Sequence, residues 1–409
     1  MTKKVPGKSV VIFGAGKIGR SFIGQLFSRS GYQTIFVDVD QGIINELNRC
    51  KRYRVVIKAE HEEQIEVKNV SGIYANDKEL VINAIANCSL MATCVGKNAL
   101  PKILPLISQG IEKRHEERPD FPLDIILAEN IRDACTLMKN GLSILLDKNF
   151  PIDSYVGLIE TSIGKMVPIM LKKDVEEDPL QVFAEPYNTL ILDKRAFKNP
   201  IPEIEGLAPK DNMNAWVDRK LFIHNLGHAT TAYLGCIEHP SATFLYEVLS
   251  DNILKEKVRS TMLQAADILI KKYPHEFTLE ALTEHIDNLL GRFQNKALGD
   301  TIFRVGCDLS RKLGREDRLA GAIHLALEQK LPYDLILNAL VCGCYFNATD
   351  QDGKMFPADI AFKKFLSSGI DNVLRDICGF NEFLDKQIFR KAVELEKAIL
   401  PVVNKKVKI

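Results

Sequence analysis

Four polar residues that can exchange protons or donate hydrogen bonds stand close together in the stretch KLFIHNLGH: Lys220, His224, Asn225 and His228. In an α-helix each residue advances by about 100°, which places both histidines within about 80° of Lys220. Asn225 falls further round, at about 140°. Apolar residues fill the opposite arc, so the stretch predicts a helix with one face on a core and one polar face. That polar face is either simply solvated or functional, and the helix alone does not decide between the two.

The bulk composition bounds the classes of protein to consider. A chain of 409 residues predicts two or three domains, and 46% hydrophobic with 26% charged residues is typical of a globular protein. The formal net charge of +1 argues against a nucleic-acid or membrane-surface partner. No apolar run approaches the roughly 18 residues that span a bilayer, and the N-terminus lacks a signal-peptide pattern. We therefore expect a cytoplasmic protein.

The cysteines do not form a recognisable framework. There are nine, and the odd number without regular spacing argues against a disulfide-stapled secreted protein. Cys342 and Cys344 form a C-x-C pair in an apolar stretch, but no second pair or nearby histidine accompanies them. We interpret them as small buried hydrophobic residues, and we expect no metal in the site.

The stretch SVVIFGAGKIGRSFIGQLFSRSGYQTIFVDVD (residues 9–40) contains the most informative pattern in the chain. An apolar strand precedes Gly14, Gly16 and Gly19, which form G-x-G-x-x-G, and a helical pattern follows. A second strand then ends at Asp38, which lies 19 residues after the third glycine. This context predicts a Rossmann-type dinucleotide site, whereas the bare glycine motif would be weak. The alternative is a glycine-rich turn in an unrelated α/β unit.

Each residue of this motif has a physical role in binding a dinucleotide. The first glycine permits the tight turn, the second lets the backbone approach the pyrophosphate, and the third allows close helix–strand packing. Asp38 would accept hydrogen bonds from the adenosine ribose and repel a 2′-phosphate, so NAD is expected rather than NADP; Asp40 is a close rival. The loop residues expected at the cofactor are Gly14, Ala15, Gly16, Lys17, Ile18 and Gly19. Lys17 is equally consistent with a solvated surface lysine.

Strands and helices continue to alternate through the first half of the chain. LMATCVG (90–96) and LDIILAEN (123–130) read as strands, and a helical pattern follows each of them. Ligands of doubly wound sheets lie at the carboxyl ends of the strands, which places Val95, Gly96 and Asn130 near the cofactor. Asn130 as a helix N-cap is the alternative.

The second half of the chain has a different texture. The proline-rich stretch KNPIPEIEGLAPKDN marks a boundary, and beyond it almost every segment shows helical periodicity. We expect helices at 215–234, 241–272, 278–292, 316–328, 332–346 and 357–399. The sequence thus predicts an α/β protein, with a doubly wound Rossmann-type domain at 1–198 and an all-α substrate domain at 199–409. A cleft between two such domains is where a dehydrogenase would bind its substrate, and the helix at 220–228 is expected to face it.

At this point the sequence resembles the polyol-specific long-chain dehydrogenase family. The resemblance rests on K-x4-N-x2-H at Lys220, Asn225 and His228, within RKLFIHNLGHATTAYLG. FGAGKIGRSFIG, TCVG, AENI and LGRFQNKALGDTIFRVGCDLSRKL match in the same order, so that the likeness covers roughly residues 10–395. The lysine–asparagine–histidine helix is the specific part of the pattern, because the glycine loop is shared by many enzymes.

The resemblance implies a metal-independent, reversible reaction between NAD and a ketose or its polyol. It implies that Lys220 is the general acid/base, that Asn225 and His228 hold the reacting oxygen, and that Asn130 lies near the reacting carbon. Gly164 and Lys165 depart from the family pattern, which has Val-Asp-Arg there, and the missing acid weakens any transfer of substrate identity. His224 is also atypical of the motif. It either joins the site or is a locally satisfied histidine.

The substrate pair that the resemblance implies first is D-mannitol 1-phosphate and D-fructose 6-phosphate. A sugar phosphate needs cationic donors, and RVGCDLSRKL supplies Arg304, Arg311 and Lys312, with Arg304 and Lys312 as the substrate-binding candidates. A solvated basic patch is the alternative. A hexuronate or a free polyol as substrate, and a non-catalytic NAD-binding sensor, remain open, as does a monomer or a small homo-oligomer.

Overall fold

The computed structural model describes residues 7–131 and 133–406. They form two compact units, the first ending at Trp216 and the second beginning at Val217. The sequence prediction placed the boundary at 198–199. In the structure, residues 199–216 belong to the first unit, because the strand β11 (Leu207–Lys210) pairs with β10 (Leu190–Asp193).

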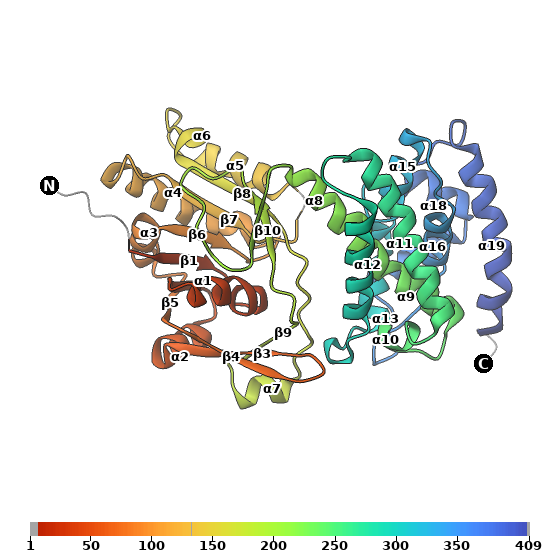
Figure 1. Ribbon diagram of the computed structural model, residues 1–409, viewed down its shortest axis with the longest axis horizontal. Helices are drawn as coiled ribbons and strands as arrows, with labels where there is room; N and C mark the ends of the chain where they lie inside the picture. Colours follow the sequence, from red (N-terminus) through yellow and green to blue (C-terminus); the bar gives the residue numbers. More distant parts are fainter. Residues whose placement is uncertain (1–6, 132, 407–409) are drawn as a thin grey trace. The chain divides into compact units, whose positions relative to one another are not determined.

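Among the described residues of the first unit, eight strands form one sheet in the order β11-β10-β8-β7-β6-β1-β2-β5 (Figure 1). The strands not yet given bounds are β1 (Ser9–Phe13), β2 (Gln33–Asp38), β5 (Val70–Tyr74), β6 (Leu90–Thr93), β7 (Leu123–Leu127) and β8 (Val156–Ser162). All neighbouring pairs in this sheet are parallel except β10 with β8, which is antiparallel. The predicted doubly wound Rossmann-type domain is confirmed.

Helices cover both faces of this sheet because its strands are apolar on both sides. Val10 and Ile12 of β1 belong to one core, whereas Val11 and Phe13 belong to another, as expected from the alternation of side chains along a strand. One face is covered by η1 (Gly19–Gly24) and α1 (Gln25–Arg29), with α2 (Gln41–Cys50) following β2. The other face is covered by α3 (Lys78–Asn87), α4 (Leu100–Glu117) and α5 (Ala134–Leu145), and the short α6 (Ile152–Tyr155) precedes β8.

A smaller sheet lies beside η1, with its strands in the order β4-β3-β9 (Figure 1). Its strands are β3 (Arg52–Ile57), β4 (Glu63–Lys68) and β9 (Val182–Ala184), and α7 (Lys172–Glu177) precedes β9. The pair β3–β4 is antiparallel. Tyr53 of β3 donates through its hydroxyl to the Arg20 carbonyl at 2.7 Å, which ties this sheet to the helix that follows the glycine loop.

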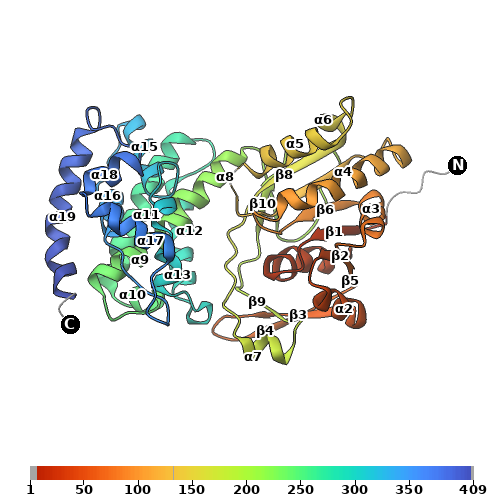
Figure 2. The same ribbon diagram turned by 180° about the vertical axis from the view of Figure 1, so that it is seen from behind.

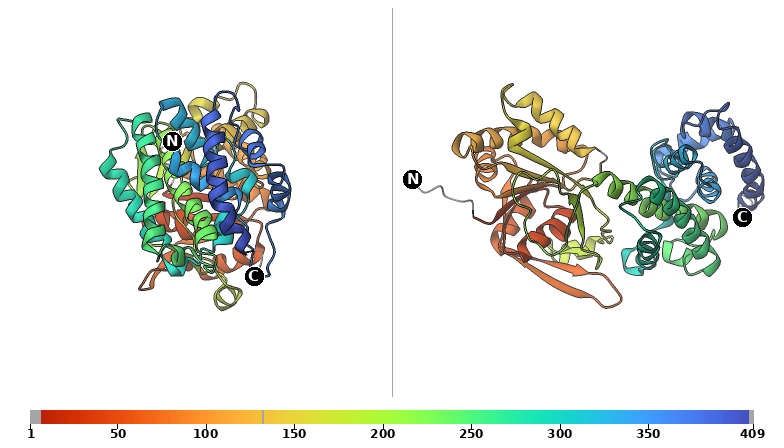
Figure 3. Two further views of the ribbon diagram at one scale, coloured as in Figure 1. Left: turned by 90° about the vertical axis from the view of Figure 1, so that its right-hand side faces the viewer. Right: turned by 45° about the horizontal axis from the view of Figure 1, so that its top comes forward.

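The second unit is helical and is built around α9 (Leu226–Glu238), which is buried along most of its length. Its helices before residue 300 are the end of α8 (Met213–Arg219), η2 (Lys220–Asn225), α10 (Leu245–Val248), α11 (Asn252–Lys272), α12 (Leu279–Phe293) and η3 (Lys296–Leu298). Those after it are α13 (Ile302–Gly306), α14 (Leu309–Lys312), α15 (Ala320–Gln329), α16 (Asp334–Cys344), α17 (Pro357–Leu366), α18 (Ile370–Asp376) and α19 (Lys386–Lys406). The helix α19 lies along the outside of this unit, next to α16 and α18 (Figures 2 and 3).

Two long helices predicted from periodicity are interrupted in the structure. The expected helix at 241–272 is split into α10 and α11, because the Asp251 carboxylate caps a new helix by accepting from the Ile253 and Leu254 amides. The expected helix at 357–399 contains α17, α18 and part of α19, and glycines with positive φ, Gly369 (114°) and Gly379 (71°), lie at the two breaks. Within the described residues, no helix has the length and apolar character needed to span a bilayer.

Candidate active site

The glycine loop between β1 and η1 has the shape of a dinucleotide cradle. Gly14 has a φ of 100°, and a β-carbon there would lie 2.6 Å from the Cys94 carbonyl oxygen. A β-carbon at Gly19 would lie 1.9 Å from the Gly14 carbonyl oxygen, so that only glycine allows this helix to approach the loop so closely. At the exposed Gly16, by contrast, a β-carbon would meet no atom within 4 Å. That open space is where the backbone is accessible to a pyrophosphate.

Asp38, at the carboxyl end of β2, contacts this loop directly. Its carboxylate accepts from the Ala15 amide at 2.6 Å and from the Asp40 amide at 3.0 Å. The rival residue, Asp40, is the N-cap of α2 and accepts from the Ile43 amide at 3.1 Å. Asp40 therefore has a local structural role, and Asp38 is the carboxylate next to the predicted cofactor loop.

The remaining loop residues are arranged around the same turn. Lys17 is exposed and Ile18 is the N-cap residue of η1. Arg20, one turn further, is buried and donates to the Ala15 carbonyl at 2.7 Å and to the Leu180 carbonyl at 2.6 Å. Its guanidinium thus fastens the glycine loop to the segment before β9. The motif did not predict this contact, because residue 180 is far away in the sequence.

The loops after β6 and β7 are joined by Glu129. Its buried carboxylate accepts from the Val95 amide at 2.9 Å and from the Gly96 amide at 2.8 Å, and Gly96 has a φ of 82°. The carboxylate therefore holds the two predicted cofactor residues at the carboxyl end of β6. Asn130 is exposed and follows β7, and it is not the N-cap of α5, because Asp133 occupies that position.

In the second unit, Lys220–Asn225 forms a π-helical turn rather than the expected α-helix. The Leu226 amide donates to the Leu221 carbonyl, five residues earlier, and α-helical geometry resumes from Leu226. The step of about 100° per residue therefore fails within this turn, and the predicted angle of Asn225 from Lys220 is wrong. In a turn with hydrogen bonds between residues five apart, Asn225 lies over Lys220. The side chains of Lys220 and Asn225 therefore share a side of the helix.

Lys220 is partly buried at the start of this turn. Burial and the nearby Arg318 guanidinium lower the pKa of Lys220 to about 8. Both causes disfavour the ammonium form, because a charge is less stable away from water and next to a like charge. A lysine with this pKa can take up and release a proton near neutral pH.

His228 lies two turns beyond Lys220 and contacts an acid that the sequence did not single out. Its Nε2 lies 3.0 Å from Oδ2 of Asp300, and the other carboxylate oxygen contacts the Arg304 guanidinium. The ring stacks on Phe293, with centroids 4.7 Å apart and an interplanar angle of 16°. The structure thus brings His228 and the predicted substrate residue Arg304 together through Asp300.

His224 is buried beside this group rather than solvated. Its ring lies 5.6 Å from that of Phe293 and 6.1 Å from that of His228, centroid to centroid. Burial, followed by His228 and Arg292, lowers the pKa of His224 well below its usual value. His224 is therefore neutral and packs against the aromatic ring that supports His228.

The other predicted cations of this region already have contacts within the protein. The Lys312 ammonium is buried and donates to the Val305 carbonyl at 2.6 Å, and burial with Arg318 lowers the pKa of Lys312 to about 8. Arg311 is half exposed and pairs with Asp308 and Asp317. Arg304 and Lys312 both lie near His228, because both lower the pKa of its imidazole.

The segment that departs from the family pattern follows β8 in the first unit. The Lys165 ammonium is buried and donates to the Tyr187 carbonyl at 2.8 Å and to Oδ1 of Asn188 at 2.9 Å. A β-carbon at Gly164 would lie 3.6 Å from the Tyr187 ring, an ordinary contact, so packing alone does not require glycine there. These contacts give Lys165 a role in holding the loop before β10.

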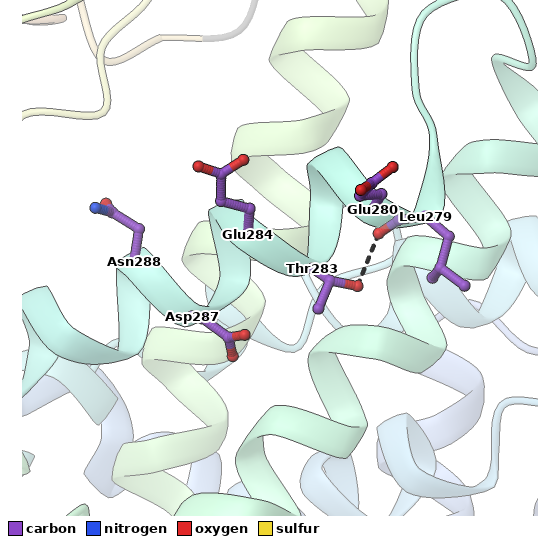
Figure 4. Close-up of a pocket in the computed structure, with 6 residues that line it drawn as sticks. All are labelled: Leu279, Glu280, Thr283, Glu284, Asp287 and Asn288. Atoms are coloured by element: carbon purple, nitrogen blue, oxygen red, sulfur yellow. Dashed lines mark hydrogen bonds between the residues drawn. The ribbon is translucent and has the colours of Figure 1, made fainter.

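A pocket of about 870 Å³ lies over α12, and none of its lining residues belongs to the group around Lys220 and His228 (Figure 4). Its lining residues are Leu279, Glu280, Thr283, Glu284, Asp287 and Asn288. Three carboxylates repel anions, so this pocket is unsuited to a dinucleotide or a sugar phosphate. Within residues 7–131 and 133–406, no group of three or more His, Cys, Asp or Glu side chains is placed to hold a metal ion.

Comparison with known proteins agrees with this geometry. Residues 8–206 match the mannitol dehydrogenase Rossmann domain, and residues 212–390 match the mannitol dehydrogenase C-terminal domain. The chain belongs to the mannitol dehydrogenase family. The glycine loop and Asp38 lie in the family's Rossmann domain, and the π-helical turn with Lys220 lies in its C-terminal domain. The resemblance noted from the sequence is thereby confirmed at the level of the family.

Two solved structures of polyol dehydrogenases share the fold. D-sorbitol dehydrogenase in substrate-free form is 16% identical with a TM-score of 0.79, over 96% of this chain and 93% of that chain. Pseudomonas fluorescens mannitol 2-dehydrogenase, solved as a ternary complex with NAD and D-mannitol, is 14% identical with a TM-score of 0.71. That alignment covers 98% of this chain and 94% of the mannitol 2-dehydrogenase chain, so both domains of the family are represented.

Proposed function

We propose that this mannitol dehydrogenase family member is an NAD-dependent polyol dehydrogenase that uses Lys220 as its general acid/base. The observation that carries the proposal is the lysine itself, which shares a π-helical turn with Asn225 and has a pKa lowered to about 8. A lysine with its ordinary pKa of about 10.4 would be protonated at neutral pH and would be a poor base. The lowered value suits proton transfer in both directions.

NAD is the cofactor in this proposal, and the glycine loop would hold it. The open backbone at Gly16 fits the pyrophosphate, and the Asp38 carboxylate at the end of β2 fits the ribose hydroxyls. When bound, NAD would supply the hydride acceptor, taking one proton together with two electrons from the polyol carbon. The carboxylate of Asp38 disfavours NADP by repelling its 2′-phosphate, and no metal is required.

Lys220 and the residues around it carry out the proton transfer and stabilise the charge on the reacting oxygen. Lys220 in its neutral form removes the hydroxyl proton of the polyol, and in its protonated form it returns a proton to the ketose oxygen. The side-chain amide of Asn225 donates a hydrogen bond to the same oxygen and stabilises its developing negative charge. Asn130, at the carboxyl end of the sheet, is assigned to the reacting carbon through the family pattern.

For the substrate, we propose D-mannitol 1-phosphate, interconverted with D-fructose 6-phosphate, as in a mannitol-1-phosphate 5-dehydrogenase. Supporting this, four cations, Arg304, Arg318, Lys312 and Arg292, lie close enough to His228 to lower the pKa of its imidazole. Such a group of cations favours a phosphate dianion. Arg304 and Lys312 are the residues assigned to the substrate.

A free polyol is the second candidate, and a specific observation favours it. Arg304 already pairs with Asp300, and Lys312 already donates to the Val305 carbonyl. A phosphate would compete with these contacts, whereas a neutral polyol would leave them in place. Two further alternatives are a hexuronate reductase, which would share the same helix motif, and a sensor protein that binds NADH without turnover.

The test is the change in absorbance at 340 nm with NAD or NADH and a panel of substrates. The panel contains mannitol 1-phosphate, fructose 6-phosphate, mannitol, sorbitol, fructose and a hexuronate. Arg304→Ala should raise the KM for fructose 6-phosphate about tenfold or more while changing the KM for fructose little, because charge-assisted hydrogen bonds to phosphate are strong. Activity with fructose alone would contradict the phosphorylated substrate, and NADH binding without any turnover would contradict the enzyme.

A further inference from the structure

The carboxylate of Asp300 joins two groups of the candidate site. Nε2 of His228 lies 3.0 Å from Oδ2, and the Arg304 guanidinium contacts Oδ1. The Asp300 side chain is only 4% exposed, and that of His228 is 16% exposed. The contact between the imidazole and the carboxylate is therefore largely shielded from water, where a hydrogen bond is strong and costly to leave unmade.

The donor and acceptor in this contact follow from chemistry. A carboxylate paired with a guanidinium only accepts hydrogen bonds, so the proton between Asp300 and His228 must be on Nε2 of the imidazole. In a neutral imidazole with its proton on Nε2, the other nitrogen, Nδ1, has a lone pair and can only accept.

The surroundings keep this imidazole neutral. It stacks on the buried ring of Phe293, and burial is the largest cause that lowers the pKa of His228. The charged and titratable groups that face it are Arg292 of α12, His224 of η2, Arg304 of α13, Lys312 of α14, and Arg318. The one carboxylate that contacts it within the described part of the chain, Asp300, also contacts Arg304, which offsets its charge.

We propose that Asp300 is a positioning residue, which holds His228 in the Nε2–H tautomer so that Nδ1 accepts a hydrogen bond from a substrate hydroxyl. This inference rests on the proposed polyol dehydrogenase activity and refines it. Lys220 and Asn225 then supply the hydrogen bonds to the reacting oxygen. His228 instead recognises a hydroxyl hydrogen, a feature that a polyol or ketose has and a molecule with only carbonyl or ether oxygens lacks.

The backbone at Asp300 is held independently of its side chain, which makes the residue suitable for substitution. The Leu245 amide donates to the Asp300 carbonyl at 2.9 Å, and the Ile302 amide donates to the Thr243 carbonyl at 2.8 Å. Asp300→Asn is nearly isosteric but offers an NH₂ group that can donate to Nε2. It should therefore shift the histidine toward the tautomer with the proton on Nδ1.

The first test is nitrogen-15 NMR of the full-length protein labelled at its histidine rings, at neutral pH. His228→Gln identifies the signal of His228 by its loss. We expect the Nε2–H pattern in the unsubstituted protein and a shift toward Nδ1–H in Asp300→Asn. Asp287→Asn, which breaks the pair between Asp287 and Arg259 elsewhere in the unit, should leave the signal unchanged. Arg304→Met should also keep the Nε2–H pattern, which separates the effect of Asp300 from that of its other partner.

The second test is kinetic. Asp300→Asn should lower kcat/KM for the best polyol about tenfold to hundredfold, the range for one mismatched buried hydrogen bond, with little change in NADH affinity. An Nδ1–H or doubly protonated His228 in the unsubstituted protein would overturn the inference even if the enzyme is active. It would also be overturned if Asp300→Asn left both the tautomer and kcat/KM unaltered. If the tautomer is as expected but no polyol or ketose reacts, the proposed activity fails instead.

Discussion

The chemistry attributed to Lys220 depends on the proton that its amine carries, so pH is the most direct probe of this residue. Its pKa is lowered to about 8 by burial and by Arg318. Below that pH the amine is protonated and cannot accept the hydroxyl proton of a polyol. We expect kcat/KM for polyol oxidation to rise about tenfold per pH unit up to pH about 8 and then level off. Ketose reduction, which needs the protonated form, should decline above the same pH, and initial rates in both directions test this.

Removing the amine is the complementary measurement. Lys220→Ala should reduce kcat about 10²- to 10⁴-fold, the usual contribution of a general base, while NADH binding measured by fluorescence stays the same. Lys257→Ala is a matched control, because the Lys257 ammonium pairs with the partly exposed Glu238 carboxylate on the same unit. A Lys220→Ala protein with near-normal kcat would show that Lys220 is not the general acid/base.

In the first unit, Asp38 is the residue expected to select NAD over NADP. Asp38→Ala should erode the preference for NAD over NADP, which we expect to be about tenfold or more in kcat/KM, because the carboxylate repels a 2′-phosphate. Asp40→Ala should affect helix α2 instead, since Asp40 caps that helix. Better activity with NADP(H) in the unsubstituted enzyme would refute the assignment of Asp38.

At the scale of the element, the helix of η2 and α9 has one face for chemistry and another for stability. Leu226, the first residue of α9, is fully buried, as the apolar arc of the sequence predicted. Leu226→Ala should lower the free energy of unfolding by about 2–5 kcal/mol, with kcat changed less than in Lys220→Ala. Urea unfolding followed by circular dichroism measures the loss. A loss near zero would show that this side of the helix is not packed.

Elements defined by local sequence were predictable, and those defined by distant contacts were not. The strand, glycine turn and helix around Gly14 follow from neighbouring residues, and their positions agree with the prediction. The π-helical turn was not predicted, because its residues fit the periodicity of an α-helix. The two kinds of helix differ in whether each backbone amide donates to the carbonyl four or five residues earlier. Asp300 was missed since 72 residues separate it from His228, and no spacing rule connects them.

At the scale of the molecule, the fold class was predictable because the chain changes from alternating strand and helix patterns to helical periodicity alone. The position of the boundary was less accessible, because β11 lies within a proline-rich stretch that reads as a loop. Substrate identity was not accessible at all. It depends on whether cations such as Arg304 contact a ligand or only a neighbouring carboxylate.

Cofactor binding should be visible in the stability of the whole chain. A ligand present at about one hundred times its Kd stabilises the folded state by about 2.7 kcal/mol. NADH should therefore raise the melting temperature of the first unit by a few degrees in calorimetry, whereas the same concentration of NADPH should raise it less. Equal shifts with both dinucleotides would contradict the role of Asp38 as the selecting carboxylate.

The π-helical turn has a consequence that concerns the length of the chain rather than its composition. Such a turn is equivalent to an α-helix into which one additional residue has been inserted. Deleting a single residue between Leu221 and His224 would restore uninterrupted α-helical winding, with Asn225 four and His228 seven residues after Lys220, at about 40° and about 20° from it. The three side chains would then still share a face. Winding all the present residues as an α-helix would instead place Asn225 at about 140° from Lys220. The shared face is therefore compatible with the loss of one residue inside the turn, whereas a change that removed the π-helical turn at constant chain length would move Asn225 away from Lys220.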